Sequence, residues 1–293
     1  MDGQEFLAER FETNRSHLRG VAYRMLGSLS EADDAVQESW LRLSRSDISD
    51  VENLRGWLTT VVARVCLDML RSRKSRSEES LEASVPDSIV NQQDGTDPEH
   101  EALLADSVGL ALLVVLDALT PAERLAFVLH DMFDVSFDEI ASIVGRSPAA
   151  ARQLASRARR RVRGVETIPD AELRSQREVV DAFLAALRNG DFEGLLSVLD
   201  PDVVVRADSV ATPPAGREIR GAANWAKGAI AFSQAAPVMQ PALVNGTVGL
   251  VLAQGGRLFR ALIFTIAHGK IVQADIIADP ARLGDLNLAV LDD

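Results

Sequence analysis

The sequence FDEIASIVGRSPAAARQLASRARRRVR, residues 137–163, decides how the rest of the chain is interpreted. Its first part places apolar residues, up to Val144, at the spacing of a single helix face. Gly145 follows, where a helix often ends in a left-handed residue. Ser147 then offers an N-cap oxygen, and Pro148 is a preferred first helical residue. The stretch therefore predicts two short helices around a tight turn.

The second of these helices has a cationic flank that contains no acidic residue. A helix, a glycine turn and a capped basic helix form the layout of a helix-turn-helix, whose second helix enters the major groove. Because the whole chain has a net charge of −12, a concentrated basic stripe indicates local binding to nucleic acid. The residues expected at the DNA are Arg146, Ser147, Pro148, Ala149, Ala150, Arg152, Gln153, Ser156, Arg157 and Arg160. The alternative is an αα-hairpin with a solvated basic end.

The composition is that of an ordinary globular protein, and 293 residues are enough for two or three domains. The lone Cys66 fits a reducing cytosol and a small core residue. The first residues resemble no signal peptide, and no apolar run reaches the length of about 18 residues that a membrane span needs. No metal-ligand spacing and no glycine-rich phosphate loop occurs. We therefore expect a cytoplasmic protein without a membrane span, metal or cofactor.

Residues 5–75 are expected to be helical. Gly27-Ser28 interrupts the pattern, and Ser30 is expected to cap a second helix with an acidic first turn. A third helical stretch, residues 51–74, ends in basic residues. From 77 to 106 no Lys or Arg occurs among many acidic residues, which predicts a solvated linker. This linker is either a plain spacer or an acidic strip that shields basic helices when DNA is absent.

The second half of the chain predicts two further units. Helices at 103–119 and from Thr120 to about Met132, the latter opened by a capping box, precede the helix-turn-helix. After 164–172 the pattern changes to helices at 176–188 and 192–199, a strand, a helix near 221–235 and hairpins. The expected strands are 203–206, 240–245, 248–253, 258–267 and 271–277, with turn signals at Asn245-Gly246, Gln254-Gly255-Gly256 and His268-Gly269. This order predicts an α+β domain with helices on one face of a curved antiparallel sheet.

Three separated motifs carry a resemblance to a known family. They are YRMLGSLSEADDAVQESWLRL at 23–43, WLTTVVARVCLDMLRSRKSR at 57–76, and LTPAERLAFVLHDMFDVSFDEIASIVGRSPAAARQLASRARRRV at 119–162. In this order and spacing they resemble a group-four (extracytoplasmic-function) sigma factor of bacterial RNA polymerase. The C-terminal part resembles the SnoaL-like cone fold of the nuclear-transport-factor superfamily. Together they are similar to the sigma subfamily that carries a fused SnoaL-like regulatory domain.

The resemblance implies a multidomain protein with two all-α sigma domains and an α+β cone domain. Sigma domain 2, for core polymerase and the −10 element, would span 1–76, and the acidic linker 77–105. Sigma domain 4, whose helix-turn-helix reads the −35 element, would span 106–165. The SnoaL-like regulatory domain would span 172–293 and contact the sigma domains. The implied partners are promoter DNA and the β′ coiled coil and β flap of core RNA polymerase.

The resemblance also implies roles for single residues. Asp33, Asp34, Gln37 and Glu38 would bind the polymerase core, and Trp57, Arg64, Arg71, Arg73 and Lys74 would hold the −10 element. Trp57 is equally credible as a core residue. Where the family often has Asp-Gly-Gly-Gly-Lys, this chain has Asp208-Ser-Val-Ala-Thr, and an Asn-Pro-Asp-Lys-Leu motif has a weak counterpart at 278–283. Asp208, Asp279 and Pro280 are therefore candidates for a regulatory contact.

Cone folds of this kind also occur in enzymes, which need an acid or base inside the cavity. Asp208, Asp275 and His268 are the available groups in the tail, and the only tyrosine is Tyr23. We expect an interaction domain without catalysis, a ligand-sensing cavity being the alternative. The expected function is that of a sigma factor. The alternative is a helix-turn-helix regulator with a ligand-binding or enzymatic cone domain, although a simple regulator has no use for the helices at 30–43 and 57–76.

Overall fold

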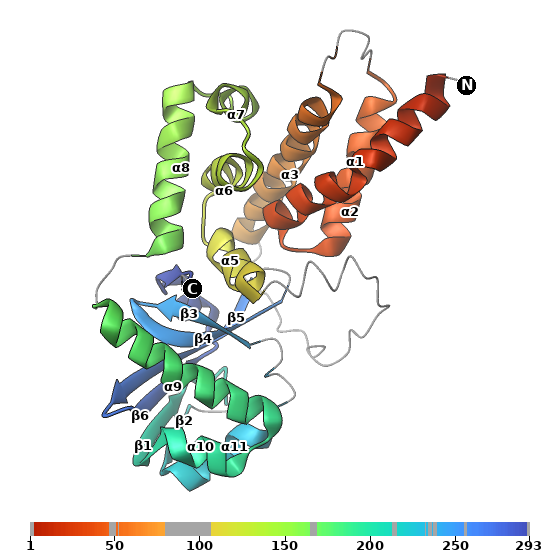
Figure 1. Ribbon diagram of the computed structural model, residues 1–293. Coiled ribbons are helices and arrows are strands. Elements are labelled where there is room, and N and C mark those ends of the chain that lie inside the picture. Colours follow the sequence, from red (N-terminus) through yellow and green to blue (C-terminus); the bar gives the residue numbers. More distant parts are fainter. Residues whose placement is uncertain are drawn as a thin grey trace. The chain divides into compact units, whose positions relative to one another are not determined.

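The computed structural model describes residues 3–46, 51, 53–79, 107–164, 169–212, 216–231, 233, 236, 239–254 and 257–291 (Figure 1). The acidic linker therefore lies outside the described residues, except for the end of the helix that precedes it. The described residues form two compact units. The first contains residues up to 79 together with 119–160, and the second contains 107–118 together with 161–291.

The first unit begins with three helices: α1 (Gly3–Leu26), α2 (Leu29–Leu43) and α3 (Leu54–Glu79). Gly27 has a φ of 77° and makes the turn between α1 and α2. The cap of α2 is Ser28, whose Oγ accepts from the amide of Glu31 at 3.4 Å, and not Ser30 as expected. Three faces of apolar side chains meet between the helices, so this bundle has its own buried core. It includes Leu18, Val21, Met25, Val36, Leu58 and Val62.

The second group of helices in this unit is α6 (Pro121–Phe127), the π-helical turn η1 (Val128–Met132), α7 (Phe137–Val144) and α8 (Pro148–Arg163). The expected capping box is confirmed, because Glu123 and Thr120 bond each other's backbone amides. A second box, between Ser136 and Glu139, opens α7. Gly145 ends α7 in the left-handed conformation, with a φ of 68°. The predicted pair of helices around a tight turn is thus confirmed.

The two groups of helices touch within the first unit. The Arg124 side chain, only 2% exposed, donates from Nε to the carbonyl of Arg24 at 3.2 Å. The Phe133 ring meets the His17 ring edge-on, with 5.3 Å between centroids, and the Arg24 guanidinium lies 5.7 Å from the Phe133 centroid. The N-terminal helices and the helix-turn-helix are therefore packed as one body.

The second unit is built on a seven-stranded sheet in the order β2-β1-β6-β5-β4-β3-β7. Its strands are β1 (Leu199–Ala207), β2 (Arg217–Arg220), β3 (Met239–Val244), β4 (Thr247–Gln254), β5 (Arg257–Ala267), β6 (Lys270–Ile277) and β7 (Leu288–Ala289). The expectation of a purely antiparallel sheet was wrong, because β1 pairs with β6 in parallel. The hairpin turns at Asn245-Gly246 and His268-Gly269 are confirmed, each with two positive φ angles. The expected turn at Gly255-Gly256 lies outside the described residues.

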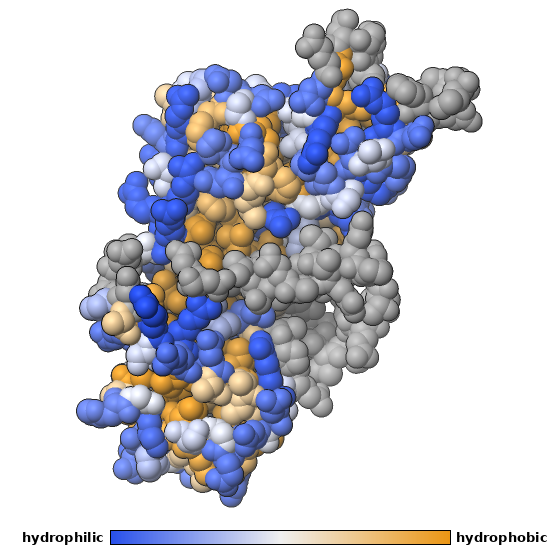
Figure 2. All heavy atoms as spheres, viewed as in Figure 1, coloured by the Kyte–Doolittle hydropathy of each residue, from blue (hydrophilic) through white to orange (hydrophobic). Residues whose placement is uncertain are grey.

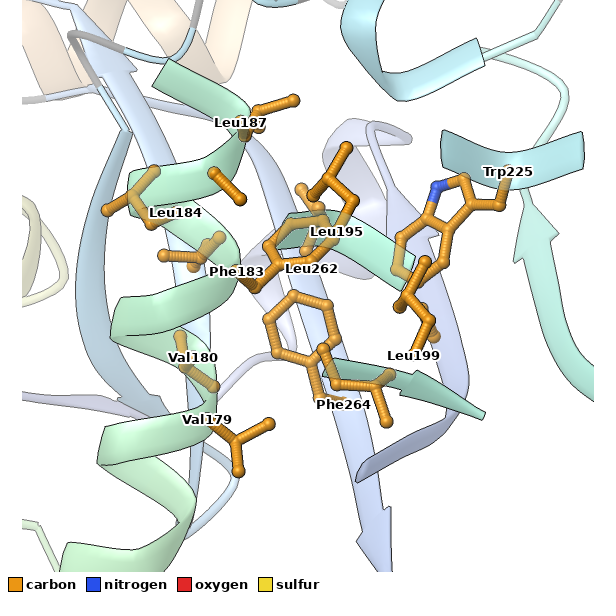
Figure 3. Packing of buried hydrophobic residues seen from close by; sticks show 14 of the residues in the cluster. Val179, Val180, Phe183, Leu184, Leu187, Leu195, Leu199, Trp225, Leu262 and Phe264 are labelled. Carbon is orange, nitrogen blue, oxygen red and sulfur yellow. The ribbon is translucent and has the colours of Figure 1, made fainter. Parts of the chain in front are cut away.

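Three helices cover one face of this sheet: α9 (Asp170–Asn189), α10 (Phe192–Val198) and α11 (Ala222–Ala231). The core between these helices and the sheet is apolar, and Figure 3 shows side chains of α9, α10 and the sheet converging there. Phe183 packs against Trp225 and Phe264, with ring centroids 5.2 and 5.5 Å apart. The expected α+β domain is thus confirmed, and the three helices predicted for it share one face of the sheet.

Two more helices belong to the second unit. α12 (Pro280–Gly284) packs on β5, and Leu283 joins Ala261 and Ile277 in a small cluster on the other face of the sheet. α5 (Ser107–Asp117) packs against β3, β4, β5 and β7. The sequence predicts this helix in one domain with the helix-turn-helix, whereas it packs on the sheet of the second unit.

Candidate nucleic-acid interface

The α8 helix divides into a buried and an exposed side. Ala151, Leu154, Ala155, Ala158 and Val162 are buried. The exposed side repeats every three or four residues, which is one face of a helix. Its members include Ala149, Arg152, Gln153, Ser156, Arg157 and Arg160. Six of the ten residues predicted for the DNA surface therefore lie on one exposed face of α8.

The other four predicted residues lie in the turn between α7 and α8 and in the first turn of α8. Arg146 and Ser147 are exposed, while Pro148 and Ala150 are half-buried. The Arg146 amide donates to the Ala141 carbonyl at 3.0 Å, and the Ala150 amide donates to Ser147 Oγ at 3.2 Å. These bonds close the end of α7 and the start of α8, so the turn holds α8 at a fixed angle.

Two arginines of α8 have partners of their own. The Arg152 guanidinium lies 5.5 Å from the centroid of the Phe137 ring, which supports the side chain without neutralising its charge. Arg159 is bonded to Asp131 of η1 and lies outside the exposed face. Arg159 is thus a link within this group of helices, and the other arginines keep the face cationic.

A second cationic stripe runs along α3. Trp57, Arg64 and Arg71 follow each other at seven-residue intervals, which places them on one side of the helix. Both arginines are exposed and Trp57 is half-buried, so the two readings of Trp57 stay open. Arg73 instead reaches back to Glu31 and to the Leu26 carbonyl. The side chain of Lys74 lies outside the described part of the chain.

The surface of α2 carries the residues predicted to bind polymerase. Asp33, Asp34 and Gln37 are exposed, and Asp33 forms an ion pair with Arg19 of α1 at 2.8 Å. Glu38 is half-buried and pairs with Arg42 at 3.0 Å, so the structure ties it to its own helix.

Helical periodicity predicts Leu41 on the apolar side of α2, and this prediction is wrong. The Leu41 side chain is 39% exposed and is the exposed large apolar residue of the described chain. It lies four residues after Gln37 and seven after Asp34, on the same stripe. An apolar residue beside exposed acids suits a protein interface, and its spacing from Gln37 could have revealed it.

The predicted regulatory residues gather around one carboxylate. Asp208, at the end of β1, has a side chain only 8% exposed. Its Oδ1 accepts from the amides of Val210 and Ala211, and its Oδ2 accepts from those of Ala278 and Asp279, all at 2.9–3.2 Å. Burial would raise the pKa of Asp208, but the hydrogen bonds from Asp279, Ala211 and Ala278 together outweigh it and lower the pKa. Asp208 therefore ties the end of β1 to the end of β6.

The neighbouring residues continue this arrangement. Asp279 caps α12 by accepting from the Arg282 amide at 3.0 Å, and Pro280 is the first residue of that helix. The Arg282 guanidinium also approaches Asp208 at 3.5 Å. Asp208, Asp279 and Pro280 are thus brought together, as parts of one compact corner.

The groups considered for catalysis do not line the apolar core of the second unit. Asp275 accepts from Gln273 Nε2 at 2.9 Å, and both lie on the face of β6 opposite Ala274, which belongs to that core. His268 is exposed in a hairpin turn. Within the described ranges no group of three His, Cys, Asp or Glu could hold a metal ion, and no helix is long and apolar enough to cross a membrane.

Comparison with known proteins bears on these surfaces. Residues 10–76 match the family model for sigma-70 region 2, and residues 109–162 match that for sigma-70 region 4. The chain is 40% identical to the ECF RNA polymerase sigma factor SigJ of Mycobacterium tuberculosis H37Rv, over 93% of this chain and 91% of that protein. It is 33% identical to the probable ECF RNA polymerase sigma factor SigI of the same organism, over 98% of both.

A crystal structure of M. tuberculosis SigJ is also similar, with 38% identity over 95% of this chain and 99% of that chain, and a TM-score of 0.48. The α2 and α3 stripes fall within the region 2 match, and the α8 face falls within the region 4 match. The full-length relatives and the two regions in order agree with the resemblance seen in the sequence. The chain belongs to the extracytoplasmic-function sigma factors of bacterial RNA polymerase.

Proposed function

We propose that this sigma factor binds core RNA polymerase through α2, opens and holds the −10 element with α3, and reads the −35 element with α8. The observation that carries the proposal is the exposed α8 face, on which small residues and arginines alternate over three turns. Ala149 and Ser156 are short enough to let the helix approach base edges, and the Gln153 amide can then hydrogen-bond to a base. The flanking arginines are suited to phosphates.

The −10 contact is supported by the stripe on α3. Arg64 and Arg71 can bind phosphates of a separated strand, and Trp57 offers a ring on which an unstacked base can lie. Arg73 contributes less directly, because its guanidinium already bonds to Glu31. We place this work in the cytoplasm, where core polymerase and promoter DNA are found.

The polymerase contact is supported by the acidic stripe of α2. Its exposed acids and Gln37 offer acceptors to the β′ coiled coil, and long-range attraction to a basic partner would raise the rate of encounter. We assign the β flap to the helices of region 4, on the strength of the family alone.

Run-off transcription with purified core polymerase tests the proposal. The full chain should restore promoter-specific starts to a core enzyme that has none. Asp34→Arg should remove these starts because it reverses the charge of the α2 stripe, whereas Glu193→Arg, at an exposed position on α10, should leave them. An ordinary helix-turn-helix regulator would restore nothing to core alone, and that result would refute the sigma assignment.

We further propose that the SnoaL-like domain modulates activity and is not catalytic. The support is that its interior is packed with apolar rings and aliphatic side chains (Figure 3). Of the possible acids and bases, Asp208 is engaged by four amides and Asp275 lies on the other face of the sheet. Deleting residues 168–293 should change transcription without abolishing polymerase binding. Loss of binding would mean that the domain is structural.

A further inference from the structure

The α5 helix belongs to two parts of the protein at once. The sigma-70 region 4 match begins at residue 109 and includes it. In the structure, however, α5 packs against β3, β4, β5 and β7 of the second unit. Four consecutive residues of α5, 113–116, are at most 3% exposed. Because successive residues point about 100° apart, α5 is a helix that is apolar all round, so exposing it to water costs free energy.

The sheet presents a matching face to this helix. Side chains of β3 and β4 alternate between the two faces, and Met239, Leu250 and Leu252 point into the core beneath α9. Their neighbours Ala242, Val244 and Val251 point to the opposite face and are nevertheless buried, at 0–1% exposure. We assign their burial to α5, since it contacts both strands and is not part of the core under α9.

The other end of region 4 is attached to the same side of the sheet. The Val290 amide, just after β7, donates to the carbonyl of Val162 in the last turn of α8 at 2.8 Å. Gly164 follows with a φ of +72°, and a Cβ added there would lie 2.7 Å from the Cβ of Ala289. Only a glycine fits this close approach without strain. β7 is itself paired with β3, antiparallel, with Ala289 opposite Leu243.

We infer that the β3–β7 edge, meaning Met239–Val244 and Leu288–Val290, is the docking surface through which the C-terminal domain holds region 4 at both of its ends. The segments that occupy it are α5 and the residues 162–164 of this same chain. The inference rests on the proposed function for its consequence: region 4 must leave this edge, at one end or both, to reach the −35 element freely. The Asp208 corner, at the ends of β1 and β6, plays no part in this grip.

Removing the Val290 amide tests whether the β3–β7 edge holds region 4. Val290→Pro abolishes the donor to Val162, while Val290→Ala keeps it and serves as the matched control. Ala289 is already in a strand, so proline adds little restriction there. In the full chain, hydrogen exchange at 162–164 and in α5 should become about tenfold faster in Val290→Pro than in Val290→Ala. Equal protection in the two variants would overturn the proposed grip.

A paired substitution tests the close approach at Gly164. Gly164→Ala should speed exchange of the same amides, since its Cβ meets Ala289. Adding Ala289→Gly should restore part of the protection, although the strain of a positive φ remains. If Ala289→Gly restores nothing, Gly164 acts only through its own backbone, and the contact with β7 does not hold region 4.

The consequence is measured by run-off transcription from a promoter with its −35 element and from one with that element scrambled. Val290→Pro should raise transcription from the intact promoter several-fold relative to Val290→Ala. Transcription from the promoter with the scrambled −35 element should be the same in both variants. Faster exchange without this rise would remove the regulatory part of the inference. If no variant and no wild-type chain starts transcription, the sigma assignment fails, while the exchange results still decide the grip.

Discussion

A single carboxylate, that of Asp208, collects four backbone amides from two separate parts of the chain. Replacing it by Asp208→Asn puts an amide NH₂ against amide donors, so the second unit should lose about 1–3 kcal/mol of stability. Because folding lowers its pKa, this contribution is fully present above the unfolded pKa of about 4 and is lost as the pH falls through the folded value.

Hydrogen exchange of the β6 amides in increasing urea, at pH 7 and at about pH 3, measures this effect. The difference in unfolding free energy between wild type and Asp208→Asn should be large at pH 7 and smaller at about pH 3. Asp202→Asn, at an exposed position of the same strand as Asp208's neighbour Ala207, should be as stable as wild type at both pH values. A stability difference for Asp208→Asn that does not depend on pH would mean that the charge of the Asp208 carboxylate does not contribute to stability.

Arg152 is the residue of α8 whose role DNA binding can resolve. Its exposed guanidinium is steadied by the Phe137 ring, which favours a defined geometry toward a base. Arg152→Ala should weaken binding to the cognate −35 element by about 1–3 kcal/mol and relax specificity at one base pair. Fluorescence anisotropy at several salt concentrations measures both, with Arg174→Ala on α9 as an exposed control. A uniform loss on all DNA with a smaller salt slope would mark a phosphate contact instead.

At the scale of a helix, α2 presents Leu41 on the same stripe as Asp34 and Gln37. Since Leu41 is exposed, Leu41→Glu should leave the stability of the first unit within about 0.5 kcal/mol of wild type. Binding to core polymerase should weaken about tenfold, because an apolar contact beside charged ones is lost. Affinity measured by surface plasmon resonance checks this, with Ser16→Glu on α1 as the control. Unchanged affinity would place the polymerase contact elsewhere.

Elements fixed by local chemistry could be predicted from the sequence, and elements fixed by distant partners could not. Gly145, Ser147 and Pro148 specify the turn before α8 within a few residues, so the helix-turn-helix was found. Arg73 pairs with Glu31, 42 positions away, and no local pattern shows that its guanidinium turns inward. The short β2 and β7 were missed for the same reason. They exist because β1 and β3 offer free edges.

At the scale of the whole chain, region 2 shares one compact unit with residues 119–160, the part of region 4 that contains the helix-turn-helix. Promoter recognition by two readers requires them to reach separate DNA elements, so this packing must open. His17 is part of the packing: its Nδ1 lies 3.0 Å from Arg55 Nη2, its Nε2 lies 3.0 Å from Thr59 Oγ1, and its ring meets Phe133. Burial and the Arg55 charge lower the pKa of His17, which keeps the ring neutral and the contact intact near pH 7.

Weakening that packing should therefore favour the open form. Phe133→Ala removes the ring that touches both His17 and Arg24 of α1. Phe137→Ala serves as the control, because the ring contacts described for Phe137 are with His130 and Arg152, both in region 4. If only an opened chain binds core polymerase, raising the open fraction lowers the apparent Kd in proportion, so Phe133→Ala should bind core several-fold more tightly. Phe137→Ala should not tighten polymerase binding. Titration of core polymerase with both variants, alongside hydrogen exchange of α1, measures binding and opening separately. Faster exchange near His17 without tighter binding would show that regions 2 and 4 bind polymerase while still packed together.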